Sequence, residues 1–447
     1  MKKIVEGPVS WLEGFGMNPG ILLTLIGLAI LVVIFSVVDT SLERAFGFMV
    51  ATAPIWLPII SFFLFFEYWM YYVRKHYDLA QGRVTLEIKL PQEVLKSPEA
   101  MELVLTQLHQ TAAPDNHVQT YWDGKHPPVT GLEIVSRGGE IHFYMSVARK
   151  KFKNITEVAL YSQYPGIEVH ELPIDYTAEI PWDPDKFQYF SIHFGLKKAD
   201  AYPLKTYFDY GLNSMPKEEE KIDPITTFLD ALANLGPGEY YWTQILIEAN
   251  REVTFKEGSL TKVPDWKKEA QEEIQKIIDE AGKRGGEESK GNVMMSLTEG
   301  EKDKIKAIER SLGKNAFNTG IRGMYIAKTE KFNPGERIGA LITAWRSYDD
   351  VNRNAIGVRW RTDYNWNWWQ DPTGRKKWAM KKREFHLYKT RGYIPEASSD
   401  PKNVMTTEEL ATIFHIPGSV ASTPTLGRIP STRGEAPPNL PTTSPAE

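Results

Sequence analysis

The chain has 447 residues, no cysteine, 53 Lys and Arg against 57 Asp and Glu, and a formal net charge of -4. A chain of this length holds two or three structural units, and the lack of cysteine excludes a disulfide framework, a thiolate zinc site and a cysteine nucleophile. The mean hydropathy of -0.36 is typical of a soluble protein, but it conceals a strongly apolar beginning.

Two apolar runs open the chain after a short start at residues 1–18. Residues 20–38 carry no charge, and residues 49–73 carry only Glu67 and end in a cluster of aromatic residues. Each run is long enough for a helix that crosses the hydrocarbon layer, and aromatic clusters favour the membrane interface. Residues 19–73 therefore predict a transmembrane hairpin; the alternative is one spanning helix and one interfacial or re-entrant segment.

Positive charge flanks this hairpin on both outer sides. Lys2 and Lys3 precede it, and Arg74, Lys75 and Arg83 follow it. Because cytoplasmic flanks are enriched in Lys and Arg, we expect a multi-pass protein of the cell inner (plasma) membrane. Both termini, including residues 1–18, would lie in the cytoplasm.

Residues 84–175 predict a first α+β domain. Alternating strands at 84–90, 131–136 and 140–147, a final strand at 166–172, and helices after Ser97 and at 150–163 give the order β-α-β-β-α-β. This is the split βαβ, ferredoxin-like arrangement, an antiparallel sheet with both helices on one face.

The same order recurs over residues 185–362, which predicts tandem ferredoxin-like domains; a single α+β sheet without duplication is the alternative. Within the second copy, residues 261–317 form an insertion with two highly charged helical stretches, at 264–282 and 297–313. We interpret it either as a projecting helical hairpin that receives a partner helix or as a solvated decoration.

A basic aromatic segment, residues 363–395, follows. Between residues 353 and 393 there are eleven Lys or Arg and three acidic residues, interleaved with Trp, Tyr and Phe. Cations track phosphates and aromatic faces stack on unpaired bases, so single-stranded nucleic acid is one candidate ligand and anionic lipid is another. A third interpretation has the tryptophans packing in a core or a subunit interface. The candidate contact residues are Arg359, Arg361, Trp366, Trp368, Trp369, Arg375, Lys376, Lys377, Lys381, Lys382 and Arg383.

The end of the chain predicts a docking helix within residues 396–416 and a disordered tail at 417–447, which is rich in Pro, Ser and Thr. The docking helix begins at a Thr-Thr-Glu-Glu cap, and its candidate partner-facing residues are Glu409, Leu410, Ile413 and Phe414.

Catalytic signatures are missing from the sequence. It contains no G-x-x-x-x-G-K-[ST], H-E-x-x-H, G-x-S-x-G or G-x-G-x-x-G, and its nine histidines lack metal-ligand spacing. We therefore expect no enzymatic activity, no cofactor and no metal.

Several blocks together resemble a known family. They are SPEAMELVLTQLH, TYWDGKHPPVTGLEIVSRGGEIHFYMSVARK, NITEVALYSQYPGIEV and the ending TTEELATIFHIPGSVASTPTLGRIPSTRGEAPPNLP. With the apolar hairpin, they resemble the amino-terminal, non-ATPase region of conjugative type IV secretion DNA-transfer proteins, the VirD4/VirB4/HerA-like group. In that group a motor domain follows, whereas no Walker A lysine or Walker B acid has a counterpart here.

The resemblance implies a membrane-anchored, non-catalytic subunit that docks a separate motor ATPase of the HerA/VirB4/VirD4 type, forms a homo-oligomer and contacts single-stranded DNA. Two alternatives remain open. The chain is either a membrane-tethered protein that binds single-stranded nucleic acid without a motor, or an oligomeric membrane scaffold.

Overall fold

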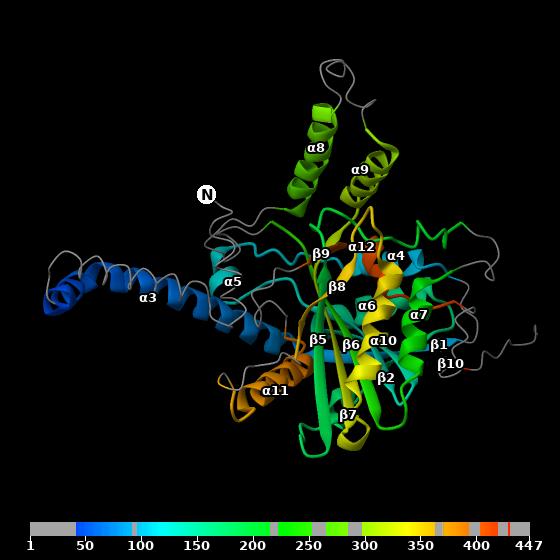
Figure 1. The fold of residues 1–447 in the computed structure, drawn as a ribbon, viewed down its shortest axis with the longest axis horizontal. Helices are drawn as coiled ribbons and strands as arrows, with labels where there is room; N and C mark the ends of the chain where they lie inside the picture. Colours follow the sequence, from blue (N-terminus) through cyan, green and yellow to red (C-terminus); the bar gives the residue numbers. More distant parts are fainter. Residues whose placement is uncertain are drawn as a thin grey trace, which may run out of the picture.

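The computed structural model describes residues 42–91, 96–214, 222–252, 265–284, 297–362, 369, 371–392, 403–418 and 428–429. Among these, one long helix extends away from a mixed α+β body, by which we mean the described residues from Arg83 onwards (Figure 1). The expected α+β class is confirmed in this broad form.

The long helix is α3 (Leu42–Gln81), which has 40 residues and includes Pro54 and Pro58. At 1.5 Å per residue it is about 60 Å long, roughly twice the hydrocarbon thickness of a bilayer. Within the described residues it is the one helix long and apolar enough to cross a membrane, over Phe46–Gln81. The expected second span falls on it, and the expected first span, residues 20–38, lies outside the described residues.

The first part of the body carries seven elements before residue 172. Its strands pair antiparallel in the order β4-β1-β3-β2, and the β2–β3 turn uses Gly138 and Gly139, both at positive φ, as a tight hairpin requires. These elements are β1 (Arg83–Pro91), α4 (Glu99–Leu108), α5 (His117–Tyr121), β2 (Thr130–Arg137), β3 (Glu140–Ala148), α6 (Arg149–Gln163) and β4 (Glu168–Glu171).

The second part repeats this alternation with longer strands. Its principal strands pair antiparallel in the order β6-β7-β5-β8. The elements are η1 (Tyr176–Glu179), β5 (Phe187–Leu196), α7 (Pro224–Ala233), β6 (Glu239–Ala249), α8 (Trp266–Arg284), α9 (Glu299–Leu312), β7 (Ala316–Lys328), η6 (Thr329–Lys331), α10 (Pro334–Ala344), η7 (Trp345–Tyr348) and β8 (Ile356–Arg361).

The two parts are joined edge to edge into one sheet. Strand β2 pairs antiparallel with β6, from Thr130 opposite Ile247 to Arg137 opposite Tyr240. Helices α8 and α9 stand out from this sheet (Figure 1) and pack together through Ala270, Ile277 and Ile308. Their bounds lie within two residues of the helical stretches expected in the insertion.

The remaining described elements come from the last quarter of the chain. They are α11 (Arg375–Thr390), β9 (Asn403–Thr406), α12 (Thr407–Ile413) and β10 (Arg428–Ile429). Strand β9 pairs with β7, and β10 adds a short parallel pair to β1. Residues 428–429 fall within the tail that was expected to be disordered, and their backbone pairs with the sheet.

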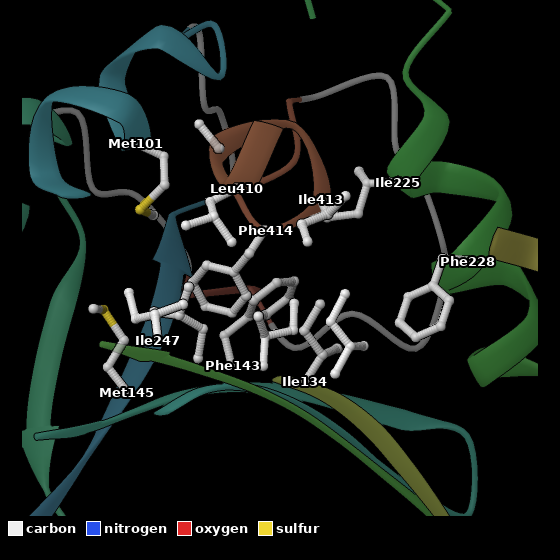
Figure 2. Packing of buried hydrophobic residues seen from close by; sticks show 14 of the residues in the cluster. Met101, Ile134, Phe143, Met145, Ile225, Phe228, Ile247, Leu410, Ile413 and Phe414 are labelled. Carbon is white, nitrogen blue, oxygen red and sulfur yellow. The ribbon is translucent and has the colours of Figure 1, made fainter. Parts of the chain in front are cut away.

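The sheet has a different cover on each face. On one face α4, α7 and α12 pack over a large apolar core that includes Phe143, Ile134 and Phe414 (Figure 2). On the other face α11 and η1 cover a smaller, aromatic core built around Tyr144, Trp242 and Tyr388. The side chains of each strand alternate between the two faces, so each buried strand supplies both cores.

Candidate functional site

The first notable feature is the junction between α3 and the body. The Trp69 indole N–H donates a hydrogen bond to the carbonyl oxygen of Tyr121 at 2.6 Å, and its ring meets Trp122 edge to face, with centroids 5.3 Å apart. One turn earlier, Phe66 contacts the Tyr121 ring, and two turns later His126 Nε2 lies 3.2 Å from an Asp78 carboxylate oxygen. These contacts hold the end of α3 against α5 and the loop after it.

The second feature is a row of polar side chains under α11. Glu133, Gln244, Arg322 and His193 stand opposite one another on β2, β6, β7 and β5. All four are buried on the aromatic face of the sheet. Charged groups at such positions are costly unless they are paired, so their partners define the site.

Glu133 is the centre of this row. Arg391, just after α11, donates from Nε and Nη2 to the two carboxylate oxygens of Glu133 at 2.9 and 3.0 Å. The Tyr176 hydroxyl and the Gln244 side-chain amide also donate to it, at 2.6 and 2.8 Å. A bidentate Arg–carboxylate pair with further donors compensates the desolvation of both charges.

Arg391 extends the site to a second carboxylate. Its Nη1 lies 2.7 Å from an Asp175 oxygen that also accepts a hydrogen bond from Thr85. Burial alone would raise the pKa of Asp175, but the Arg391 charge and the donors of Thr177 outweigh it and lower the pKa. Burial alone would lower the pKa of Arg391, but the charge of the Glu133 carboxylate outweighs burial and raises the pKa.

The other end of the row is held by Arg322 and His193. Arg322 donates from Nε to the Gln244 oxygen at 2.8 Å and from Nη2 to the Leu387 carbonyl oxygen at 2.7 Å, and burial lowers its pKa to about 10. His193 Nε2 lies 2.7 Å from a Glu384 oxygen. Burial would raise the pKa of Glu384, but the His193 ring outweighs it and the net shift is downward.

We call these groups the Glu133 network. It links four strands to α11, η1 and the chain just after α11, and its donors and acceptors mostly satisfy one another. Within the described part of the chain, Arg322 Nη1 and His193 Nδ1 are buried without a hydrogen-bond partner. Sites of this kind bind an ordered water when there is room for one. The members of the network are Glu133, Arg391, Asp175, Tyr176, Gln244, Arg322, His193 and Glu384.

A cavity of about 1480 Å³ lies where the network reaches α3. Its described lining includes Arg83, Asp175 and Arg391 from the body and Met70 and Asp78 from α3. The cavity therefore separates the apolar helix from the charged end of the network, and its wall carries both signs of charge.

The structure divides the candidate basic residues between two environments. Trp366 and Trp368 lie outside the described residues, and Trp369 is 62% exposed. On β8, Arg361 is exposed, and Arg359 is exposed but donates to the Leu196 carbonyl oxygen at 2.6 Å. On α11 the exposed cations form one stripe, which we call the α11 stripe: Arg375, Lys376, Lys382 and Arg383.

The opposite face of α11 is turned inward. Lys381 is buried, with its Nζ 4.8 Å from the centre of the Trp378 ring, and Lys377 is half-buried. Phe385 and Tyr388 belong to the aromatic core. The interpretation that aromatic residues of this segment pack in a core therefore holds for α11, and these rings are not free to stack on bases.

The structure corrects the prediction of a partner-facing docking helix. Glu409, Leu410, Ile413 and Phe414 are all buried, and Figure 2 shows α12 lying between α4 and α7 over the sheet. Glu409 accepts hydrogen bonds from the backbone of Thr406 and of Leu204, both at 2.8 Å. The apolar face of this helix packs into the chain's own core, together with residues of α4 and α7.

The Glu133 network was not predicted from the sequence. Its one local signal is a charged residue inside an apolar strand, as in the run Leu132-Glu133-Ile134, whose neighbours on both sides are buried. The pairing itself joins residues 258 positions apart, which no local pattern contains.

The comparisons with known proteins give one finding. A family model described as "Domain of unknown function (DUF8128)" matches residues 77–428, and none of the curated proteins matches the chain. The match begins near the end of α3, covers the whole described sheet and ends at β10, so it includes the Glu133 network and α12. Because the match covers well over half of the chain, the chain belongs to the DUF8128 family.

Proposed function

We propose that this protein is a membrane-anchored, non-enzymatic assembly subunit of a DNA-transfer complex. In this proposal α3 and the apolar run before it form a two-helix hairpin in the inner membrane. The body lies on the cytoplasmic side, where a separate motor ATPase acts. The observation that carries the proposal is the direct connection of α3 to β1, in which a single residue, Gly82, lies between a 40-residue apolar helix and the sheet.

The contacts at this junction support an anchor more than a flexible tether. The helix packs on α5 through Trp69 and on α6, where Lys151 Nζ reaches the Tyr77 hydroxyl at 3.3 Å. A body held in this way keeps a fixed orientation relative to α3, which suits a subunit that must assemble with copies of itself or with other proteins.

We further propose that the body consists of two tandem ferredoxin-like units that meet through β2 and β6. The support is the order of pairing, β4-β1-β3-β2 in the first unit and β8-β5-β7-β6 in the second, with a helix after the first and third strand of each. The second strands of the two units pair antiparallel, as a local two-fold relation between the units requires.

The secretion process itself rests on the resemblance to conjugative DNA-transfer proteins. Since α12 is buried, the surface that we assign to a partner ATPase is the α8–α9 hairpin. It projects from the body (Figure 1) and presents charged side chains such as Lys283, Glu280 and Lys306. Affinity purification of the full chain from native membranes is expected to recover a motor ATPase of the HerA/VirB4/VirD4 type, and to lose it when residues 266–312 are replaced by a short linker. Recovery of no such ATPase would remove the secretion proposal.

The orientation of the body relative to the membrane can be tested separately by labelling a single introduced cysteine, because the chain has no cysteine of its own. Val351 is 93% exposed on the body, so Val351→Cys offers one reactive thiol. We expect a membrane-impermeant maleimide to label it only after the cells are opened. Labelling in intact cells would place the body outside and contradict the proposal.

A second candidate function is the binding of single-stranded nucleic acid. The observation that favours it is the α11 stripe, four cations on one exposed helix face, since such cations neutralise the phosphates of a nucleic-acid backbone. The buried rings of α11 argue for phosphate contacts rather than base stacking.

A further inference from the structure

A second apolar surface lies beside α3. Val118, on α5, is 57% exposed, and Trp122, just after α5, is 68% exposed. Tyr121 lies between them and is half-buried against Phe66. We call these three residues the α5 platform. Single exposed apolar residues are ordinary, but these three are adjacent to the one described helix that suits a membrane.

The contacts with α3 place the α5 platform at a definite level along that helix. Tyr121 and Trp122 meet α3 at Phe66 and Trp69. Arg74 and Lys75 follow one turn further on, and the apolar run ends with them. In a spanning helix, tryptophan and tyrosine followed by Lys or Arg mark the boundary between hydrocarbon and water. Figure 1 shows α5 beside the end of α3 that enters the body.

We infer that the α5 platform enters the interfacial layer of the same bilayer that holds α3, and so gives the body a second membrane contact. Val118 and Trp122 supply the apolar area that favours this layer, and the Trp122 indole and Tyr121 hydroxyl have the amphipathic character that it selects. Lys125, paired with Asp115 at 3.2 Å, lies a few residues on and falls at the level of the lipid headgroups. The occupant is the lipid interface itself.

This second contact would do what a single helix cannot. One spanning helix leaves the body free to rotate about the helix axis, whereas a second lipid contact beside that axis restrains the rotation. The inference rests on the proposed anchoring by α3, so its test includes a separate measurement of that anchor.

The experiment uses the full chain in lipid nanodiscs with one cysteine introduced at a time. The sites are Phe63→Cys on α3, Val118→Cys on the α5 platform and Val351→Cys at an exposed position of the body, each labelled with an environment-sensitive fluorophore. Lipids that carry a nitroxide high on the acyl chain are the quencher. We expect strong quenching at Phe63→Cys and Val118→Cys, severalfold above that at Val351→Cys, and a blue-shifted emission at both.

The outcomes separate the two claims. Quenching at Phe63→Cys with none at Val118→Cys overturns the α5 platform and leaves the anchor intact. A blue shift at Val118→Cys without lipid quenching assigns the platform to a second protein surface and also overturns the inference. If Phe63→Cys itself is not quenched, then α3 is not in the bilayer, and the proposals of the anchor and of the platform are both wrong. Trp122→Cys repeats the measurement at a second platform position.

Discussion

Arg391 and Glu133 form a two-pronged ion pair between the end of α11 and strand β2, at 2.9 and 3.0 Å. The two side chains are 4% and 0% exposed. Arg391 also adopts a positive φ of 50°, which is uncommon for a residue other than glycine. The chain therefore turns sharply at the residue that closes α11 onto the sheet.

Replacing Arg391 is expected to destabilise the protein strongly. Arg391→Met leaves the buried Glu133 carboxylate without its counter-charge, which costs about 3–5 kcal/mol when one partner of a buried pair is removed. Thermal unfolding of the full chain in detergent, followed by tryptophan fluorescence, measures the loss. The exposed Arg383→Met on the same helix is the matched control, and we expect it to change stability by less than about 0.5 kcal/mol.

The double variant Arg391→Met with Glu133→Gln tests the electrostatic cause. It removes both charges, so it is expected to recover part of the stability that Arg391→Met loses. If the double variant loses as much unfolding free energy as the two single variants added together, the loss comes from packing and not from an unpaired charge.

The buried amine of Lys381 predicts a pH dependence. Burial, together with the nearby charge of Lys377, lowers the pKa of Lys381 from 10.5 to about 8. Above pH 8 the folded chain releases this proton while the unfolded chain keeps it up to about pH 10.5. The unfolding free energy of the native protein therefore rises through that range relative to Lys381→Met, by at most about 3 kcal/mol.

The Trp378 ring attracts the Lys381 ammonium and so favours its charged form, which makes the rise in unfolding free energy smaller. The measurement is the difference in unfolding free energy between the two proteins at pH 7.5 and pH 10. A difference that stays constant over this range would show that Lys381 titrates normally and reaches water.

Helix α12 is expected to behave as core. Leu410 is fully buried, so Leu410→Ala should cost about 3 kcal/mol through lost transfer energy and the cavity that remains. Leu103→Ala, on the exposed side of α4, removes the same atoms from a helix surface and should cost little. If Leu410→Ala folds as well as the native chain and only loses a bound partner, the assignment of α12 to the core is wrong.

The α11 stripe predicts a salt-dependent contact with phosphates. We expect Lys382→Glu with Arg383→Glu to weaken single-strand DNA binding by the full chain in neutral nanodiscs and to lower the salt slope by about 1.4, since each lost contact contributes roughly 0.7. Lys283→Glu with Lys306→Glu, two exposed cations of the α8–α9 hairpin, changes the net charge equally at another place. Equal binding by both double variants would exclude the stripe as a nucleic-acid surface.

Much of the secondary structure could be predicted because its causes are local. The Gly138-Gly139 turn and the alternation around it give β2 and β3 within a residue or two. Asp223 before Pro224 caps α7 and accepts from the Ile225 N–H at 3.1 Å. Helix caps and strand alternation depend on neighbours within a few positions, so a single sequence contains them.

What the sequence did not reveal is which surface each helix buries. The Thr-Thr-Glu-Glu start of α12 has the appearance of an exposed, polar end, yet Glu409 accepts its hydrogen bonds from backbone amides inside the core. In α11 the spacing of Trp378, Lys381, Phe385 and Tyr388 is helical and marks one face, but eleven cations in the region concealed it. The docking prediction for α12 failed, and the three interpretations of residues 363–395 stayed open, because the partner that covers a helix comes from a distant part of the chain.

The position of α12 has a consequence for synthesis. Helices α4 and α7 leave the ribosome long before α12, so until about residue 414 has emerged the groove between them has no helix of its own to fill it. Met101 and Ile225 lie on the two sides of that groove (Figure 2), so both side chains stay open to water or to a chaperone until α12 has been made. The body becomes a closed unit only after α12 has been made.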